Sequence, residues 1–313
     1  MAVRGRGLVG VDLGGTKTAL ALMDDRGEVV ARDVFATQAA DGVEAWLERA
    51  AAAARRLAPA GVRAVGVGAA GQVDPSGVLV ATANVGGWRG INLGARLGER
   101  LGCPGTTDND AKVELMAELD RGAARGCRTA LLVAVGTGIG GAIALDGRVY
   151  RGAHGFAGEV GHAFVAGGDR PCGCGRAGHL ETLASGTGIL HSALERARGR
   201  PDGVLAEELR REPGARAVFA AARRGDADAQ EVLDAAADLL GGSIAGLVTV
   251  LDPEVVVLAG GVAAADDAFW RRARRAFEGA VHPTLERTPW RPAALGEGAG
   301  AIGACLVARS LVA

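Results

Sequence analysis

The sequence predicts an α/β fold with two lobes, each built on a mixed β-sheet. Two observations along the 313 residues support this prediction. First, short apolar runs bounded by glycine or aspartate alternate with longer amphipathic or alanine-rich segments, which is typical of strands alternating with helices. Second, one pattern of strand, glycine turn, strand, hairpin and strand occurs near the N-terminus and again from residue 130. A repeat at such a distance indicates two similar lobes.

The first lobe is predicted to begin with three strands. Apolar runs at 7–12 and 19–23 flank a glycine turn, and the polar turn at 24–27 predicts a hairpin that leads into a strand at 28–35. Beyond them we expect a helix at 41–57, a buried strand at 62–67, a short helix at 93–101, a strand end at 105–110 and a helix at 111–121.

The second lobe is predicted to repeat this beginning. Strands at 130–135, 142–145 and 148–150 surround a glycine turn and a short hairpin, alanine-rich helices fill 186–250, a buried strand covers 251–261, and helices follow at 267–280 and 300–311. We expect residues 1–125 and the C-terminal helix 300–313 to form the smaller lobe, and residues 126–299 to form the larger one.

Composition excludes several classes of partner. The formal net charge of -1 argues against a nucleic-acid or membrane-surface role. No run approaches the roughly 18 apolar residues that a membrane span needs, and the first residues lack the apolar segment of a signal peptide. Among the five cysteines only Cys172 and Cys174 cluster, which favours a reducing cytoplasm and a metal site over a disulfide framework.

Two common nucleotide-binding signatures fail in this chain. The glycines at 136–141 match the dinucleotide fingerprint in spacing, but they lead into a strand where that fingerprint requires a helix. The glycines at 10–15 resemble a phosphate-binding loop, but Thr16 occupies the position of its lysine. Two strand–glycine–strand turns remain, and their backbone N–H groups either approach phosphate oxygens or simply close tight hairpins.

The densest cluster of reactive residues lies between 159 and 181. Its candidate metal ligands are His162, Cys172, Cys174 and His179. Two nitrogen and two sulfur ligands without an open position suit a structural, tetrahedral Zn²⁺. Glu159 and Glu181 flank these ligands, either as contacts for a polar substrate or as solvated loop charges.

Several motifs in order along the chain together resemble one family. They are Asp12-x-Gly14-Gly15-Thr16-Lys17, Asn109-Asp110, Gly136-Thr137-Gly138, Glu159-x-Gly-His162, Cys172-x-Cys174, Glu181, Ser185-Gly186 and Gly260-Gly261. From about residue 8 to 310 the chain resembles the bacterial ROK sugar kinases. The resemblance implies a two-lobed actin-like ATPase fold, a duplicated ribonuclease H-like arrangement with a mixed sheet in each lobe and a cleft between the lobes.

The resemblance also implies an activity and a set of roles. It implies ATP-dependent phosphorylation of a hexose, most readily glucose to glucose 6-phosphate, with catalytic Mg²⁺ and structural Zn²⁺. Asp110 falls on the general base, although Asp at this position could equally cap the following helix. The implied sugar contacts are Asn109, Asp110, Glu159, His162, Glu181 and Asn84, and His162 would share its ring between zinc and sugar. Asp12 would orient hydrated Mg²⁺, and the implied nucleotide contacts are Gly14, Gly15, Thr16, Lys17, Gly136, Thr137, Gly138, Gly260 and Gly261.

The sequence is also compatible with two other functions, and it departs from the family pattern at one metal ligand. An N-acylhexosamine kinase would share the sugar contacts, and a non-catalytic sugar sensor or repressor is the alternative from a different class. A repressor needs a DNA-binding segment, for which the first strand at about residue 8 leaves no room. His179 replaces a cysteine of the family, so zinc binding depends on the reach of its ring. The resemblance further implies a homodimer or homotetramer, and the cysteine pattern given above favours the cytoplasm.

Overall fold

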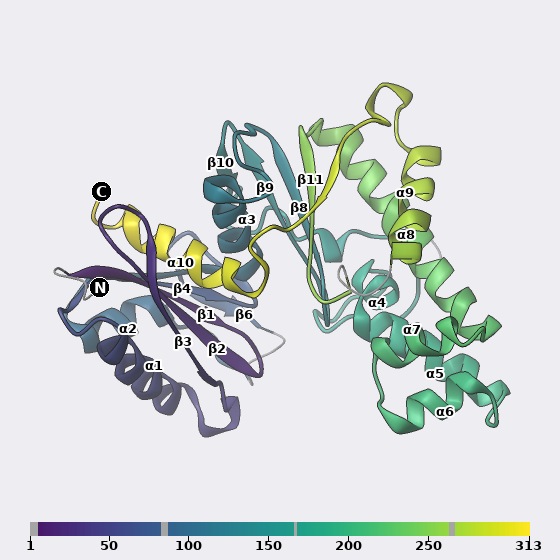
Figure 1. Cartoon of the computed structure of the whole chain (residues 1–313), viewed down its shortest axis with the longest axis horizontal. Coiled ribbons are helices and arrows are strands. Elements are labelled where there is room, and N and C mark those ends of the chain that lie inside the picture. The colour runs from purple at the N-terminus through teal and green to yellow at the C-terminus, as the bar shows by residue number, and fades with distance from the viewer. Residues whose placement is uncertain (1–5, 83–86, 166–167, 263–266) are drawn as a thin grey trace. The chain divides into compact units, whose positions relative to one another are not determined.

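The structure is a computed structural model that describes residues 6–82, 87–165, 168–262 and 267–313 (Figure 1). Two compact units form from interleaved parts of the chain. The first unit comprises Met1–Cys127, Ala142–Gly158 and Ala293–Ala313, and the second comprises Arg128–Gly141 and Glu159–Pro292. Both ends of the chain therefore belong to the first unit.

The first unit contains a five-stranded mixed sheet in the order β3-β2-β1-β4-β7. Its strands are β1 (Gly7–Leu13), β2 (Lys17–Met23), β3 (Val29–Ala36), β4 (Val62–Ala69) and β7 (Gly105–Asn109). The first three strands pair antiparallel, whereas β4 runs parallel to β1 and β7. The predicted hairpins are confirmed, but residues 105–109 form a full strand and not only a strand end. A small hairpin of β5 (Gln72–Val73) and β6 (Leu79–Ala81) was not predicted.

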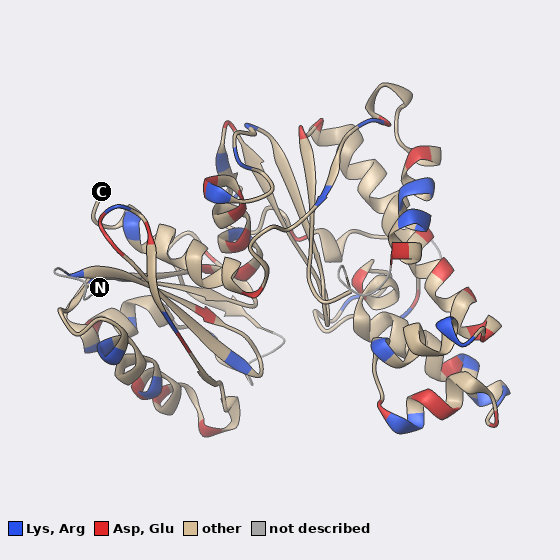
Figure 2. Ribbon diagram, in the orientation of Figure 1, with Lys and Arg blue, Asp and Glu red and all other residues tan. Residues whose placement is uncertain are grey.

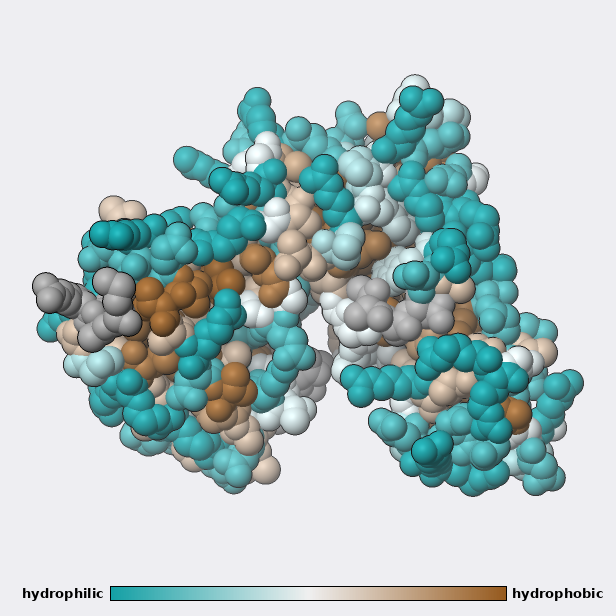
Figure 3. Space-filling model, in the orientation of Figure 1, coloured by the Kyte–Doolittle hydropathy of each residue, from teal (hydrophilic) through white to brown (hydrophobic). Residues whose placement is uncertain are grey.

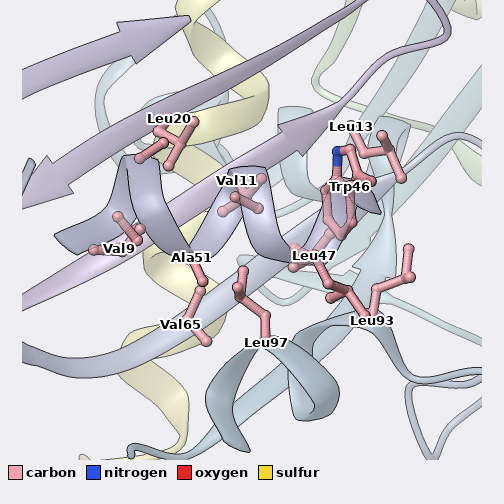
Figure 4. Close-up of a cluster of buried hydrophobic side chains, with 14 of the residues drawn as sticks. Val9, Val11, Leu13, Leu20, Trp46, Leu47, Ala51, Val65, Leu93 and Leu97 are labelled. Atoms are coloured by element: carbon pink, nitrogen blue, oxygen red, sulfur yellow. The ribbon is translucent and has the colours of Figure 1, made fainter. Parts of the chain in front are cut away.

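One face of this sheet is covered by α1 (Val43–Leu57) and α2 (Leu93–Leu101). Trp46 lies fully buried in this core beside Leu13 (Figure 4), and its indole N–H donates to the Thr18 hydroxyl at 3.0 Å. The helix predicted from residue 41 begins only at Val43. Gly42, at φ 87°, separates it from a short 3₁₀ helix at Ala39–Asp41.

The other face of the sheet is covered by α10 (Ala299–Ser310), which also packs on α3 (Asp110–Arg121). This helix approaches the strands so closely that side chains are excluded. A Cβ atom at Gly10 would lie 2.0 Å from the Ala301 carbonyl oxygen, and one at Gly66 would lie 2.0 Å from that of Ala304. The glycines of β1 and β4 therefore set the distance between sheet and helix.

The carboxylate of Glu118, which is 0% exposed, holds two segments of the first unit. One lies just before the chain leaves this unit at Cys127, and the other begins where the chain returns to it at Ala293. The Glu118 carboxylate accepts hydrogen bonds from the Ala123 N–H at 2.6 Å, the Ala294 N–H at 3.1 Å and the Leu295 N–H at 3.0 Å. A buried carboxylate is tolerated only with such partners. Glu118 therefore fixes the chain on the first unit both before it enters the second unit and after it returns.

The second sheet has the order β10-β9-β8-β11-β12. Its strands are β8 (Ala130–Val135), β9 (Ile139–Leu145), β10 (Arg148–Tyr150), β11 (Val255–Ala259) and β12 (Trp290–Pro292). β8, β11 and β12 are parallel, whereas β9 and β10 form an antiparallel hairpin, so this sheet is mixed, as predicted. The strand predicted from residue 251 begins only at Val255 because the preceding helix continues through Leu251 and ends at Asp252, with φ 45°. β12 was not predicted.

In the division of the chain given above, β10 and most of β9 belong to the first unit, and the other strands of this sheet belong to the second unit together with most of the helices. The helices of the second unit are α4 (Glu181–Ala184), α5 (Gly186–Gly199), α6 (Val204–Arg211), α7 (Ala215–Arg223), α8 (Ala227–Leu251) and α9 (Asp267–Ala280), with 3₁₀ helices at Val160–His162 and Pro283–Leu285; a further 3₁₀ helix, Gly296–Gly298, belongs to the first unit. α8 packs on α9 through Gly241, where a Cβ atom would lie 2.1 Å from the Ala273 carbonyl oxygen.

Charged side chains gather mainly on the helices and turns, and the strands β8, β9 and β11 carry none (Figure 2). The face of each unit seen in Figure 3 is largely hydrophilic, with smaller apolar patches. Within the described ranges, α8 is the one helix long and apolar enough to cross a membrane, and 50% of its most apolar window is buried in the protein. Burial of that extent is typical of a core helix in a globular unit.

Candidate functional site

The Asn109-Asp110 pair lies where β7 ends and α3 begins. Asn109 is 6% exposed, and its side-chain oxygen accepts the Lys112 N–H at 3.1 Å, so Asn109 is the N-cap of α3. The alternative that Asp110 caps this helix is therefore wrong, because Asp110 is the first helical residue. The Asn109 amide donates to the Asp110 carboxylate at 2.9 Å and to the Gly71 carbonyl oxygen at 2.9 Å. The cap thereby holds the neighbouring carboxylate in one orientation.

Asp108 precedes this pair and is 7% exposed. One of its carboxylate oxygens accepts from the Arg151 guanidinium at 2.6 and 3.0 Å, and the other accepts the Asn109 N–H at 2.9 Å. Asp108 is thus used in an ion pair with the residue that follows β10. Nothing in the sequence pattern indicated this pair, because 43 residues separate its members.

Asp12 lies at the end of β1, beside the exposed turn that Gly15, Thr16 and Lys17 share. Burial raises the pKa of its carboxyl to about 6, against the opposing effect of Lys17. A Cβ atom at Gly300 would lie 2.5 Å from the Asp12 carboxyl carbon, so the first turn of α10 packs directly on this group. Asp12 is therefore a desolvated carboxylate, which a divalent cation would stabilise in its charged form.

A cavity of about 230 Å³ opens beside this turn, lined by Asp12, Gly14, Lys17, Arg32, Glu297 and Gly298 among others. The Lys17 ammonium donates to the Glu297 carboxylate at 2.5 Å across it. Because both side chains are more than half exposed, this ion pair contributes little to stability. The turn nevertheless presents a cation and backbone N–H groups on one exposed surface.

In the second unit, the glycine turn between β8 and β9 is held from two sides. The Gly136 carbonyl oxygen accepts the Gly186 N–H at 2.8 Å, and that of Thr137 accepts the Thr187 N–H at 3.1 Å, so the N-terminus of α5 packs on the turn. Gly260 closes the other side at φ 87°, where a Cβ atom would lie 2.4 Å from the Val135 carbonyl oxygen. Thr137 remains exposed, as do Gly260 and Gly261, so the predicted nucleotide-binding positions of this unit lie on its surface.

The four predicted metal ligands lie together, with their ligand atoms within 4.8 Å of one another. His162 Nδ1 lies 3.1 Å from His179 Nδ1 and 3.7 Å from Cys172 Sγ, and Cys174 Sγ lies 3.4 Å from His179 Nδ1. A tetrahedral zinc ion separates nitrogen and sulfur ligands by about 3.3–3.8 Å. The donor set therefore fits Zn²⁺ in both chemistry and spacing, and the ring of His179 reaches the site.

Cys172 and Cys174 both belong to a tight turn at 172–176, in which the Cys174 N–H lies 3.5 Å from Cys172 Sγ. The Cys172 N–H donates to the Arg176 carbonyl oxygen at 2.7 Å, and Gly175 closes the turn at φ 88°. Burial raises the pKa of the Cys172 thiol to about 12. A metal ion would supply the charge needed to hold this residue as a thiolate.

The two glutamates of the cluster occupy different positions around His162. Its Nε2 atom lies 3.9 Å from the Glu159 carboxylate, whereas its Nδ1 atom faces the cysteines. The Glu181 carboxylate lies 2.9 Å from Cys172 Sγ, and a Cβ atom at Gly138 would lie 2.9 Å from its other oxygen. Glu181 therefore lies between the metal ligands and the glycine turn.

One functional candidate, Glu114, was missed in the sequence, and one predicted candidate, Asn84, is not among the described residues. Glu114 lies on the face of α3 that also carries Asp110. Burial raises its pKa to about 8, and the charges of Asp110, Asp12 and Glu118 add to this effect. Its spacing of four residues from Asp110 was the available signal.

The chain is similar to known proteins over nearly its whole length. A family model described as "ROK family" matches residues 8–310. The chain is 36% identical to a glucokinase of Halalkalibacterium halodurans over 309 residues, which cover 95% of this chain and 93% of that protein. It is 30% identical to an N-acetylmannosamine kinase of Citrobacter koseri over 306 residues, which cover 96% of this chain and 97% of that protein.

Among solved structures, a ROK family glucokinase from Streptomyces griseus in complex with glucose and AMPPNP matches with a TM-score of 0.81 and 31% identity. The match covers 97% of this chain and 99% of that chain. Together with the two mixed sheets, this similarity confirms the predicted α/β fold of the actin-like ATPase type.

Proposed function

Because the chain belongs to the ROK family and is an ATP-dependent sugar kinase, we propose that it phosphorylates glucose at its 6-hydroxyl. The similarity to a glucokinase over nearly the whole length of both chains carries this choice of sugar. The chemistry of the candidate side chains is consistent with it, because a hexose offers hydroxyl groups and these candidates supply carboxylates, an amide and an imidazole.

Asp110 is proposed as the general base. Its carboxylate accepts the proton of the 6-hydroxyl while that oxygen attacks the γ-phosphorus of ATP, the bond to the β,γ-bridging oxygen breaks, and ADP leaves. The hydrogen bond from the Asn109 amide at 2.9 Å supports the assignment, since it orients the carboxylate before any sugar arrives. A positioned carboxylate contributes typically about 10²–10⁴-fold to the rate.

The proposed sugar contacts are Asn109, Glu159, His162 and Glu181, with Asn84 as a further candidate. Both protons of the Asn109 amide already serve Gly71 and Asp110, so its contact with sugar would use the amide oxygen. His162 offers Nε2 to a hydroxyl while Nδ1 faces the metal ligands. Carboxylates that bond particular hydroxyls let such a site reject analogues that lack them.

The nucleotide side uses the two glycine turns in this proposal. Backbone N–H groups of the exposed residues Gly15, Thr16 and Thr137 would bond phosphate oxygens, with Lys17 adding a positive charge. The N–H groups of Gly14 and Gly136 donate to the Lys17 and Gly138 carbonyl oxygens, so these glycines would shape the turns that border the nucleotide. Gly260 and Gly261 would border the nucleotide. Bound Mg²⁺ would supply charge neutralisation at the phosphates, and Asp12 would orient its water ligands.

Zinc is proposed as a structural ion held by His162, Cys172, Cys174 and His179. The supporting observation is that four suitable ligand atoms lie within 4.8 Å. Holding these residues together fixes the loop that carries Glu159 and Glu181. Such a closed set of four ligands leaves no position for catalysis at the metal.

A second candidate acceptor is an N-acylhexosamine, because the similarity to an N-acetylmannosamine kinase covers nearly the whole chain. A non-catalytic sugar sensor is the alternative from a different class. The retained Asp12 and Asp110 favour a kinase, because a sensor needs neither a residue that orients Mg²⁺ nor a general base. We further propose a cytoplasmic enzyme, consistent with five free cysteines, that assembles as a homodimer or homotetramer.

The test is a coupled assay of ADP release with MgATP and a panel of glucose, mannose, N-acetylmannosamine and N-acetylglucosamine. We expect the highest kcat/KM with glucose. A higher kcat/KM with an N-acylhexosamine would show that this sugar, and not glucose, is the acceptor. Absence of turnover with every sugar of the panel would support the non-catalytic sensor. Polyphosphate in place of ATP tests the donor in the same assay.

A further inference from the structure

An ion pair lies directly behind the proposed base. Asp108 is 7% exposed, and its carboxylate accepts from both Nε and Nη2 of Arg151. The same carboxylate accepts the backbone N–H of Asn109 through its other oxygen at 2.9 Å. Both oxygens of Asp108 therefore serve partners within the protein, which makes it unsuited to act as a base itself.

The hydrogen bonds continue from this pair to the reacting group. Asn109 is held at its backbone by Asp108, and its side-chain oxygen accepts the Lys112 N–H. Its amide then donates to the Asp110 carboxylate at 2.9 Å. A continuous path of four residues thus runs from the Arg151 guanidinium to the carboxylate of Asp110.

Arg151 also has a second connection through its backbone. Its carbonyl oxygen accepts the Ala157 N–H at 3.0 Å, which closes the loop that follows β10. Two residues after Ala157 the chain reaches Glu159, a proposed sugar contact. Gly155, in the same loop, lies so close to Val73 that a Cβ atom there would be 2.5 Å from the Val73 carbonyl oxygen. The side chain and the carbonyl of Arg151 therefore join the segment before Glu159 to the strand before Asp110.

We propose that Arg151 and Asp108 are a positioning pair that fixes the orientation of the base through Asn109 and ties the loop before Glu159 to it. This inference rests on the proposed role of Asp110. The pair is not catalytic, because neither member contacts the reacting atoms. Removing Arg151 leaves the buried Asp108 carboxylate without its cation and next to the base, whereas Asp108→Asn removes the acceptor that holds Arg151. Both the geometry and the electrostatic environment of Asp110 then change.

The first experiment compares Arg151→Ala, Asp108→Asn and the double variant by steady-state kinetics. We expect kcat to fall by about 10²-fold in each single variant, as for an approximately 1 Å displacement of a catalytic group, with KM for the sugar changed much less. Since both substitutions interrupt one path, the double variant should be no worse than the worse single variant. Arg151→Lys should restore part of kcat, because lysine supplies the charge but not the two-point contact.

The matched control is Arg148→Ala, on the same short strand. Arg148 is exposed, and within the residues that the structure describes it forms no ion pair and no side-chain hydrogen bond. We expect its kinetics to equal those of the parent protein. A fall of kcat in Arg148→Ala equal to that in Arg151→Ala would contradict the inference.

The second readout is the pH profile of kcat/KM, which a purely structural role would leave in place. In Arg151→Ala the unpaired Asp108 charge opposes ionisation of Asp110, so the acidic limb should move to higher pH. In the double variant both charges are absent, and the limb should return toward its original position. Glu114 also acts electrostatically with Asp110, and Asp12 and Glu118 act on Glu114, but all three are present in every variant and cancel in the comparison.

These outcomes separate this inference from the proposed function. Full turnover in Asp110→Asn would remove the base on which both depend. Loss of turnover in Asp110→Asn together with unchanged kcat in Arg151→Ala would overturn the positioning pair alone. So would a fall in kcat without a shift of the acidic limb, matched by an equal fall in the fraction of folded protein measured by circular dichroism.

Discussion

At the scale of single residues, the proposed proton transfer depends on Asp110. Asp110→Asn keeps the size and the hydrogen bond from Asn109 but cannot accept the hydroxyl proton. We expect kcat to fall by about 10²–10⁴-fold while sugar binding, measured by calorimetry, is retained. Asp120→Asn, on the last turn of the same helix, is the control and should keep parental turnover.

His179 determines whether the metal site is complete. His179→Cys should retain one zinc per chain, since sulfur and nitrogen ligands are both acceptable to a structural zinc site. His179→Ala should lose affinity by at least the roughly 10–100-fold that loss of an outer-sphere partner already costs. Metal analysis of purified protein under a zinc-buffering chelator measures both. His191→Ala, outside the cluster, is the control, and full zinc in His179→Ala would contradict the four-ligand site.

Glu114 predicts a pH dependence of stability. Burial raises its pKa from an ordinary 4.5 to about 8, so between these values the folded protein holds a proton that the unfolded chain has released. The free energy of unfolding from this group therefore decreases as the pH rises from about 4.5 to about 8. Glu114→Gln removes this titration, so its stability relative to the parent should increase across that window. Urea denaturation at several pH values tests this, and a constant difference would refute it.

The sequence predicted single residues where they are adjacent in a motif. Asn109 with Asp110, and the ligands between 162 and 179, were placed together correctly because few residues separate them. Arg151 with Asp108, and Ala294 and Leu295 with Glu118, were missed because these contacts join segments 43 to 177 residues apart. The sequence could not show which residue caps α3, because Asn109 and Asp110 are both suitable. The hydrogen bond from the Lys112 N–H identifies the cap as Asn109.

At the scale of elements, adjacent glycines of α8 offer a matched pair of substitutions. A Cβ atom at Gly241 would lie 2.1 Å from the Ala273 carbonyl oxygen on α9, whereas at Gly242 nothing lies within 4 Å. Gly241→Ala should therefore destabilise the protein by about 1–3 kcal/mol or more. Gly242→Ala should stabilise it by about 0.5–1 kcal/mol, because alanine favours the helix. Thermal unfolding distinguishes them, and equal effects would contradict the close packing of α8 on α9.

Elements with strong local signals were predicted well. The strands at 130–135 and 148–150 and the helices at 93–101 and 267–280 have the predicted bounds. The errors occur where the backbone conformation of a single residue sets the end of a helix or strand. Gly42 and Asp252, both at positive φ, end or divide elements that the apolar pattern continued across. β12 is three residues long and pairs with β11 far away in the sequence, so no local pattern could reveal it.

At the scale of the whole molecule, the first unit depends on the end of the chain. Ending the protein at residue 298 removes α10 and uncovers a buried apolar cluster that includes Leu8, Met23 and Ala64. We expect this variant to be insoluble or to lack a cooperative unfolding transition, because the sheet loses the cover of one face. Removal of Ala313 alone is the control. A soluble, cooperatively unfolding protein ending at residue 298 would contradict the prediction.

The interleaved division of the chain has a consequence for biosynthesis. The second unit is complete once Pro292 has been translated, but Ala293–Ala313 of the first unit are still to come. Domains generally fold as units as they leave the ribosome, with the N-terminal one first. Here that order is reversed, because the sheet that emerges first must wait for the last helix. A nascent chain therefore carries an uncovered apolar sheet face throughout its synthesis, and this is the stage at which it most needs a chaperone.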